Sequence, residues 1–401
     1  MLSKKTLKQT IVLAFIGASF AHAPMMFAQE GLSKTPNLSK EVAAITPVDE
    51  VVMPQGYPTE LDELTPDIRS YVVVDQETNR ILMARQANTP YPIASMSKVP
   101  AVYMVYKAIE EGKLSLDQKI KVPAEIVEHL SNNPELSSAY LKTDVEYPVK
   151  DLIYSVMMES GNDATSALLW HIYGSEQAAV QAIRDQLTEW GLTNFEFYIT
   201  SGAPNQYLPE SMWMPGSTAS DENKMSAADM ALVAQYVVEK YPQILEVTSS
   251  KEYVFMKGTD HERTLFTPIA LLEGGEYGRP GVTGLKSGLT DAAGKNFVTT
   301  TTENGRKLIS VVMGIKPEFS SYQETGILLD GLAKHPDLYK LEGLSSNRIP
   351  TLAERQAEEA SLAAQNASSN EQSDKAHIPQ YENKRDSFLT NLMRSIFGFF
   401  N

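Results

Sequence analysis

Apolar residues recur along the chain with two different spacings, and each spacing predicts a different kind of element. Spacings of three and four residues, which are typical of helices, mark 149–158, 163–173, 176–189 and 226–240. Strand-like runs flank this helical region, at 71–74 and 80–83 before it and at 281–287, 296–302 and 307–314 after it. A final amphipathic run at 322–334 predicts a closing helix.

This order of elements predicts an α+β fold. Strands at both ends of the domain, with helices between them, indicate one mixed, mainly antiparallel sheet built from distant segments. We expect helices to cover that sheet and an inserted helical subdomain to lie at one side. The domain should span residues 61–340.

The N-terminal residues resemble an export signal. Lys4, Lys5 and Lys8 precede a short apolar segment from Ile11 to Ala23, which is the usual order in a secretory signal peptide. We expect residues 1–28 to be this signal, with cleavage after Ala23 or after Ala28; an uncleaved anchor is the alternative, although the apolar run is short for a membrane span. Residues 29–60 then form a leader into the fold, and the protein is exported.

The C-terminal residues have two further compositions. Residues 341–384 are rich in Ala, Glu, Gln, Asn and Ser, cannot bury much surface, and are expected to form a tether, partly helical near 353–364. Residues 385–401 place apolar side chains on one helical face: Phe388, Leu389, Leu392, Met393, Ile396, Phe397 and Phe400. This segment is too short to span a bilayer but suits an amphipathic helix lying in the membrane surface. A terminal helix docked on its own domain is the alternative.

Composition excludes several classes of function. A net charge of −15 over 401 residues argues against nucleic acid as a partner, because phosphate binding needs a basic face. The chain has no cysteine, so it has no disulfide, thiol nucleophile or thiolate metal site. Its 6 histidines are scattered without metal-ligand spacing, so neither a metal nor another cofactor is expected, and a Ser-His-Asp triad has no support in the sequence.

A possible nucleophile stands at the start of the first long helix. Ser95 and Lys98 are three residues apart, so they share one helical face and the amine can reach the hydroxyl. An amine that loses its proton turns serine into an effective nucleophile. The alternative is an ordinary helix start, with Ser95 as a cap and Lys98 in solvent.

Two other stretches can supply partners for this serine. Ser160 and Asn162 lie between two apolar helical runs that would hold their side chains rigidly. Lys286, Ser287 and Gly288 follow a strand-like run, and a glycine there allows close backbone approach. Alone, either stretch is equally well explained as ordinary loop or turn sequence.

Together, and in this order, the three motifs resemble those of the penicillin-recognising serine enzymes, Ser-x-x-Lys, Ser-x-Asn and Lys-[Thr/Ser]-Gly. The stretches Ser160–Ala164 and Lys286–Gly294 are most similar to the low-molecular-mass penicillin-binding proteins that act as D-alanyl-D-alanine carboxypeptidases. The resemblance covers about residues 45–340 and implies a β-lactamase/transpeptidase-like fold. It also implies hydrolysis of peptidoglycan stem pentapeptides, a part in cell-wall construction and cell shape, and inhibition by β-lactams. Many relatives end in an amphipathic anchor, which favours attachment of residues 385–401 to the outer face of the cytoplasmic membrane.

The resemblance also implies a role for each motif residue. Ser95 would attack the carbonyl between the two D-alanines, Lys98 would take its proton, and Ser160 would carry a proton to the leaving amine. Asn162 would hold the substrate amide and Lys98. The terminal carboxylate would face Lys286 and Ser287, and the peptide would add as a strand along residues 286–289, including Gly288. The N–H groups of Ser95 and Leu289 would form the oxyanion hole.

The chain departs from its relatives in three ways. Residues 341–384 are too few and too polar for the second, β-rich domain that many relatives carry. Leu289 stands where some relatives have histidine, so only a backbone role is expected there. An arginine that helps hold the substrate carboxylate in some relatives has no match after Gly314, and Lys316 is the nearest cation.

Other functions stay open. A class A-like β-lactamase shares the three motifs but needs a deacylating Glu-x-x-Leu-Asn loop. Glu189 approximates that loop with its asparagine one position late, and an ordinary helix-end carboxylate explains it better. A non-catalytic, membrane-bound module that binds cell wall or β-lactams is another class, although it would not need an intact nucleophile. A transpeptidase differs only in the second acceptor.

Overall fold

The computed structural model describes residues 51–64, 67–351 and 353–362. The predicted signal, most of the predicted leader, and the predicted anchor helix at 385–401 lie outside these residues. In the part of the chain that is described, no helix is long and apolar enough to cross a bilayer.

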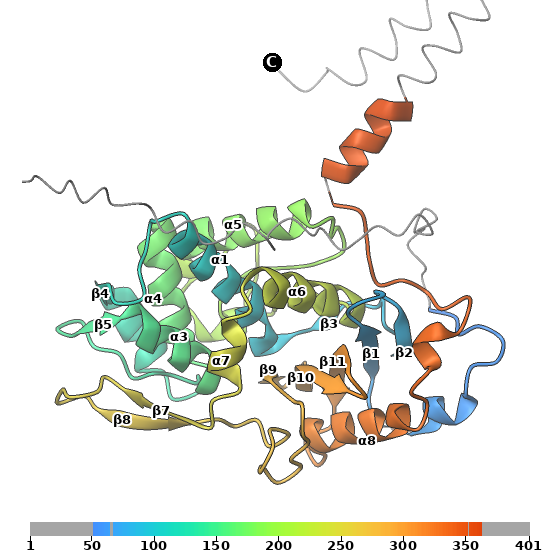
Figure 1. Ribbon diagram of the computed structural model, residues 1–401. Helices are drawn as coiled ribbons and strands as arrows, with labels where there is room; N and C mark the ends of the chain where they lie inside the picture. The colour runs from blue at the N-terminus through green and yellow to red at the C-terminus, as the bar shows by residue number, and fades with distance from the viewer. Residues whose placement is uncertain (1–50, 65–66, 352, 363–401) are drawn as a thin grey trace, which may run out of the picture. The chain divides into compact units, whose positions relative to one another are not determined.

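One five-stranded sheet brings the two ends of the domain together. Its strand order is β2-β1-β11-β10-β9, and every pairing in it is antiparallel. The strands are β1 (Ser70–Asp75), β2 (Ile81–Arg85), β9 (Gly284–Thr290), β10 (Gly294–Glu303) and β11 (Arg306–Ile315). β1 pairs with β11 although more than 200 residues separate them in sequence (Figure 1). The predicted sheet of distant, mainly antiparallel segments is confirmed.

Helices cover both faces of this sheet. α8 packs on β10 and β11 from one side, and α6 packs on β1 and β11 from the other (Figure 1). The helices are α1 (Lys98–Glu110), α2 (Ala124–Ile126), α3 (Val149–Met158), α4 (Asn162–Tyr173), α5 (Glu176–Glu189), α6 (Ala227–Lys240), α7 (Ile244–Thr248) and α8 (Ser321–Ala333). The helices α3, α4, α5, α6 and α8 agree with the predicted ranges to within one residue, because each has a continuous apolar face.

Each face of the sheet has its own hydrophobic core. Val72 and Val74 of β1 belong to the larger cluster under α1, α4 and α6. Tyr71 and Val73, which alternate with them, belong to the cluster under α8. Alternation along a strand therefore divides the core into two layers, and the whole of β1 is buried.

Three two-stranded ribbons were not expected from the sequence. They pair β3 (Tyr91–Pro92) with β6 (Lys224–Met225), β4 (Lys119–Lys121) with β5 (Glu146–Pro148), and β7 (Glu252–Phe255) with β8 (Arg263–Phe266). Strands of two to four residues are too short for their hydrophobic alternation to be distinguished from loop sequence.

The packed chain continues beyond residue 340, where the tether was predicted to begin. Ile81 N donates to Ser345 O at 2.8 Å and Asn347 N donates to Asn79 O at 2.7 Å. Asn347 and Arg348 are buried. Residues 341–350 thus form part of the folded unit despite their polar composition, because backbone hydrogen bonds to β2 and its turn hold them. A helix follows over 353–362, within the range predicted as helical.

Candidate active site

Ser95 lies in a tightly held turn at the start of α1. A short 3₁₀ segment, Ala94–Ser97, leads into that helix, and Ala94 has a left-handed backbone with φ of 48°. Such a conformation costs free energy in any residue with a side chain, so the surroundings must enforce it. The Ser97 hydroxyl donates to Ala94 O at 2.6 Å, and Asn223 Nδ2 donates to Ser97 Oγ at 2.9 Å. These buried bonds fix the turn that presents Ser95.

Lys98 is fully buried and its amine has three close partners. Nζ lies 2.9 Å from Ser95 Oγ, 2.9 Å from Asn162 Oδ1 and 2.7 Å from Ser201 O. No carboxylate is among these partners. The solvated helix start, which was the alternative reading of this pair, is therefore excluded.

Two effects lower the pKa of Lys98 well below its usual range. Burial is the larger and the nearby charge of Lys286 is the second, while Asp163 opposes them. A neutral amine has two N–H bonds and one lone pair. Asn162 Oδ1 and Ser201 O can only accept, so they take the two N–H bonds. The lone pair then faces Ser95 Oγ, which is the geometry of a base ready to accept the serine proton.

Ser160 and Asn162 come from the turn between α3 and α4. Ser160 has a left-handed backbone with φ of 59°, and its hydroxyl is buried without a hydrogen-bond partner among the described residues. Asn162 Nδ2 donates to Ser137 O at 2.8 Å, which assigns the side-chain oxygen to Lys98. The turn thus contains one hydroxyl without a partner, that of Ser160, and one side-chain amide, that of Asn162, whose oxygen and nitrogen are both hydrogen-bonded.

Asp163 anchors the loop opposite this turn. Its buried carboxylate accepts hydrogen bonds from two serine hydroxyls and three backbone amides: Ser131 Oγ, Ser138 Oγ, Ala139 N, Leu141 N and Ala164 N. These five hydrogen bonds satisfy the carboxylate oxygens in the protein interior. They hold residues 131–141 against the start of α4, where Asn162 lies.

The third motif lies on β9, which is the edge strand of the sheet. Lys286 is 2% exposed, and burial lowers its pKa to about 7. Its amine donates to Ser287 O at 2.9 Å, and no other partner of that amine occurs among the described residues. Leu289, by contrast, is 61% exposed. Its side chain therefore extends into solvent, and its backbone can bind a ligand.

Gly288 is required for a reason other than the one expected from the sequence. A Cβ at this position would lie 2.8 Å from Ile93 O and 3.1 Å from Ser95 N. The strand therefore packs directly on the turn that carries Ser95. The missing side chain permits this contact between two parts of the site, whereas the sequence suggested only approach by a substrate.

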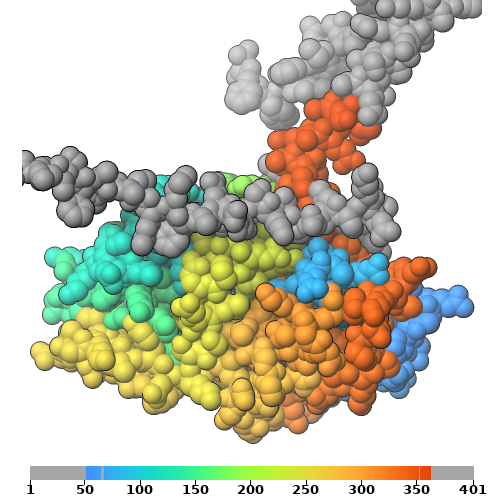
Figure 2. Space-filling model, viewed as in Figure 1, coloured from blue at the N-terminus to red at the C-terminus, as the bar shows by residue number. Residues whose placement is uncertain are grey.

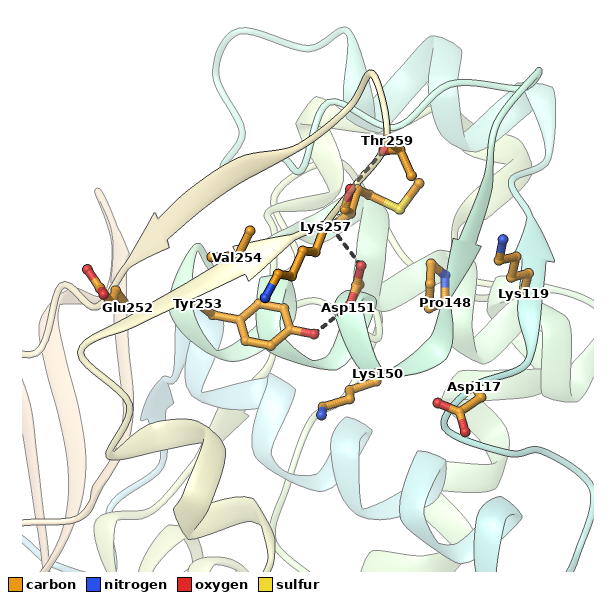
Figure 3. Close-up of a pocket in the computed structure, with 11 residues that line it drawn as sticks. Asp117, Lys119, Pro148, Lys150, Asp151, Glu252, Tyr253, Val254, Lys257 and Thr259 are labelled. Carbon is orange, nitrogen blue, oxygen red and sulfur yellow. Dashed lines mark hydrogen bonds between the residues drawn. The ribbon is translucent and has the colours of Figure 1, made fainter.

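The ribbon of β7 and β8 is bonded to both ends of α3. At the start of the helix, Asp151 accepts hydrogen bonds from Tyr253 OH at 2.5 Å and from Met256 N at 2.8 Å (Figure 3). Just after its end, Arg263 forms a two-pronged ion pair with Glu159. The ribbon consequently lies beside residues that precede it by about 100 positions (Figure 2), and it braces the turn that contains Ser160.

A cavity of about 560 Å³ lies at the start of α3, beside Asp151 and Tyr253 (Figure 3). This cavity lies at the start of α3, whereas Ser160 follows the end of that helix. Ten residues at 1.5 Å each place the two ends of α3 roughly 15 Å apart. The candidate active site is therefore the meeting point of α1, α4 and β9.

The structure brings Ser95, Lys98 and Asn162 into direct contact and packs Gly288 on the Ser95 turn, and it leaves other candidates aside. Lys316 is paired with Asp67 at 2.7 Å. Glu189 ends α5 and accepts a hydrogen bond from Gln186 at 3.0 Å, as expected of a helix-end carboxylate. Sequence reasoning missed Ser201, whose contribution is a backbone oxygen, and Arg263, whose partner Glu159 is 104 residues away.

Comparison with known proteins identifies the family to which the chain is similar. Residues 59–317 match the Peptidase_S11 family, described as D-alanyl-D-alanine carboxypeptidase. The chain is 28% identical over 268 residues to the D-alanyl-D-alanine carboxypeptidase DacC of Escherichia coli, covering 66% of this chain and 60% of that protein. It is 30% identical over 250 residues to DacA of Haemophilus influenzae, covering 62% of this chain and 57% of that protein. The match thus spans about three fifths of the length of these relatives.

Among solved structures, the peptidoglycan synthesis regulatory factor PBP3 of Streptococcus pneumoniae has a similar fold. The TM-score is 0.62 with 32% sequence identity, and the match covers 68% of this chain and 71% of that chain. The family match over residues 59–317 contains the five-stranded sheet and the three motifs.

Proposed function

The chain belongs to the Peptidase_S11 family of D-alanyl-D-alanine carboxypeptidases, and from this membership and the site geometry we propose that it is a serine-type D-Ala-D-Ala carboxypeptidase. Its substrate would be the stem pentapeptide of peptidoglycan, from which it removes the terminal D-alanine through an acyl-enzyme on Ser95. One observation carries this proposal. The Lys98 amine lies 2.9 Å from Ser95 Oγ, with its other two partners able only to accept hydrogen bonds.

In the first step, Ser95 Oγ attacks the carbonyl carbon of the penultimate D-alanine. The hydroxyl proton passes to the lone pair of neutral Lys98, and a tetrahedral oxyanion forms. The N–H groups of Ser95 and Leu289 would stabilise that oxyanion. Close packing of Gly288 on the Ser95 turn supports this pairing, since it sets β9 directly beside Ser95 N.

The tetrahedral intermediate then loses D-alanine. The C–N bond breaks, and the leaving amine takes the proton that Lys98 received, relayed by the Ser160 hydroxyl. That hydroxyl is buried and unpartnered among the described residues, so it is available for the relay. The product of this step is an ester between Ser95 and the shortened peptide. Water hydrolyses this ester and regenerates the serine.

Substrate would bind along β9. An edge strand offers unpaired backbone groups, so an extended peptide can add to it as a further strand. Asn162 would hold the substrate amide, and Lys286 and Ser287 would face the terminal carboxylate. An ammonium group has three donors, and Lys286 uses one of them on Ser287 O. β-Lactams would acylate Ser95 in the same way and act as inhibitors.

The experiment that tests this proposal measures two products. We expect the purified protein to release D-alanine from an acyl-D-Ala-D-Ala peptide and to be labelled by fluorescent penicillin. Ser95→Ala should abolish both, whereas Ser249→Ala, at the exposed end of α7, should leave both unchanged. Labelling that persists in Ser95→Ala would refute the nucleophile. Rapid hydrolysis of penicillin without D-alanine release would identify a β-lactamase instead.

We also propose export and attachment to the outer face of the cytoplasmic membrane through residues 385–401. The apolar face of that segment in the sequence and the cations Lys384, Arg385 and Arg394 support binding to an anionic lipid surface. Deleting residues 385–401 should move the protein from the membrane fraction to the soluble fraction. Unchanged sedimentation with membranes would refute the anchor.

A further inference from the structure

The proposed binding mode defines which part of β9 meets the acyl half of the substrate. The terminal carboxylate would face Lys286 and Ser287, and the scissile carbonyl would meet the N–H group of Leu289. The peptide would therefore run antiparallel to β9, with its earlier residues continuing past Leu289. Because successive residues of a strand are about 3.3 Å apart, the residue before the two D-alanines would lie beside Thr290, the last residue of β9.

A buried carboxylate, that of Glu222, is bonded to β9 at this point. Thr290 Oγ1 donates to Glu222 Oε2 at 2.7 Å and accepts from Ala293 N at 3.1 Å. Glu222 is 9% exposed. Its second oxygen, Oε1, accepts no hydrogen bond from the described residues and is not sealed from solvent. One oxygen is thus fixed against the end of β9, while the other can accept a hydrogen bond from a ligand.

The same glutamate lies beside the turn that carries Ser95. β3 and β6 pair antiparallel, and a further bond from Ile93 N to Asn223 O at 2.9 Å extends that pairing. Continuing this register places Glu222 beside Ala94, the residue before Ser95. Glu222 therefore lies where the Ser95 turn and the end of β9 meet, next to the proposed oxyanion hole.

The charges around Glu222 leave its carboxylate without a cation of its own. Burial has the largest effect and raises the pKa of Glu222. The Thr290 hydrogen bond lowers this pKa, the charge of Asp291 raises it and that of Lys224 lowers it. The Lys224 amine, however, is paired with Glu196 at 3.2 Å. A cation brought by the substrate would therefore stabilise the charged form of this carboxylate.

Two other cations near this end of the sheet have different contacts. The Lys295 amine, on β10, donates to Pro317 O at 2.5 Å and to Phe319 O at 2.8 Å. The Arg69 guanidinium lies over the Tyr91 ring, 5.2 Å from its centroid. Neither side chain forms an ion pair with the carboxylate bonded to the end of β9, so that carboxylate is available to a cationic ligand.

Resting on the proposed function, we propose that Glu222 determines specificity for the acyl half of the substrate by binding the cationic side chain of the residue immediately before D-Ala-D-Ala. Oε1 would accept a charge-assisted hydrogen bond from that side chain, while the Thr290 bond keeps the carboxylate in place. A stem peptide with a lysine-like amine at this position has the matching group, and a peptide with a neutral side chain there lacks it.

The test compares two substrates that differ by one amine, Nα-acetyl-Lys-D-Ala-D-Ala and its norleucine analogue. Release of D-alanine is measured at pH 7.5 and low ionic strength. For the wild type we expect kcat/KM to be about tenfold higher for the lysine peptide, mostly through a lower KM, as a hydrogen bond between charged groups would give.

Glu222→Gln keeps the size of the side chain and an oxygen for the Thr290 bond but removes the charge. The preference for the lysine peptide should fall to about twofold or less. Because both peptides are measured on one sample, their ratio does not depend on the amount of folded enzyme. Glu189→Gln, the matched control, removes one charge at the exposed end of α5 and should keep the tenfold preference.

Equal kcat/KM values for the two peptides in the wild type, or an undiminished lysine preference in Glu222→Gln, would overturn this role of Glu222. Both results differ from failure of the proposed function itself. That failure would appear as a wild-type protein that releases D-alanine from neither peptide and is not acylated on Ser95.

Discussion

The two buried lysines of the site occupy very different surroundings. Lys98, on α1, has three hydrogen-bond partners, and together they use every bonding direction of a neutral amine. Lys286, on β9, has one partner among the described residues. Neither amine is paired with a carboxylate. Burial lowers the pKa of both, to about 7 for Lys286 and well below the usual lysine range for Lys98.

The difference between these surroundings separates two tasks. A saturated, neutral amine can take a proton from the one partner that has a proton to give, which is Ser95. An amine with unused donors can receive an anionic ligand. The charge of Lys286 also helps keep Lys98 neutral, so the residue that would bind the substrate carboxylate assists the residue that would act as base.

Removing the Lys98 amine should have the largest effect. Lys98→Met keeps the length of the side chain but cannot accept the Ser95 proton, so we expect the rate of Ser95 acylation by penicillin to fall about 10³-fold, within the usual range for loss of a general base. Stopped-flow labelling measures this rate. Thermal stability should be retained or increased, since a buried polar group is lost. Acylation at near wild-type rate would show that another group is the base.

Removing the Lys286 amine should have a smaller effect of a different kind. For Lys286→Met we expect kcat/KM for D-Ala-D-Ala peptides to fall roughly 10- to 100-fold, the worth of a hydrogen bond to a charged group. Most of this loss should appear in KM. A variant that loses kcat alone, with unchanged KM, would place Lys286 in proton transfer and would remove the contrast with Lys98.

Loss of the ion pair between Arg263 of β8 and Glu159, just after α3, should have a weaker effect on activity. Arg263→Met breaks the two-pronged pair with Glu159 and releases the turn that carries Ser160. A small displacement of a catalytic group slows the reaction, and we expect kcat to fall about fivefold to twentyfold with little change in KM. Arg263→Lys, the conservative control, should recover part of this loss. Equal kinetics in wild type and Arg263→Met would show that the Arg263–Glu159 ion pair is not needed for activity.

The smallest expected effect is on stability. Lys286 has a lower pKa in the folded protein than in the unfolded chain, so between pH 7 and 10.5 the unfolded state binds more protons. Wild-type stability therefore rises with pH across this window, relative to a variant without the amine. Lys286→Met should accordingly raise Tm more at pH 6 than at pH 9, as scanning calorimetry can measure. A larger gain at pH 9 would contradict the assigned pKa.

The sequence predicted the parts of this fold that have long hydrophobic patterns. Helices such as α3 and α5 match their expected ranges, and the sheet follows from strand-like runs at the two ends of the domain. The short ribbons were missed because two to four residues give no periodicity. The boundary at residue 340 was placed too early, because the backbone hydrogen bonds that hold residues 341–350 leave no trace in composition.

The sequence likewise predicted the motif side chains of the candidate site but missed the contacts that depend on backbone atoms or on the assembled fold. The three motifs in their order along the chain pointed to the residues at the start of α1, because Ser95 with Lys98, taken alone, is also explained by an ordinary helix start. Contacts made by backbone atoms, such as Ser201 O, carry no sequence signal. The contact of Tyr322 on α8 with Phe297 on β10 depends on which face of a strand a helix covers, and that is settled only by the assembled fold.

The state of Lys98 before reaction is the central claim, and the pH dependence of Ser95 acylation tests it most directly. The second-order rate constant for penicillin labelling should be measured from pH 5 to pH 11 in wild type and in Lys286→Met. We predict that the wild-type rate rises at a pKa far below that of an ordinary lysine, as Lys98 loses its proton, and falls near pH 7 as Lys286 loses its charge. The fall should be absent in Lys286→Met. A wild-type rate that increases only above pH 10 would show that Lys98 is charged at neutral pH and would contradict its assignment as the base.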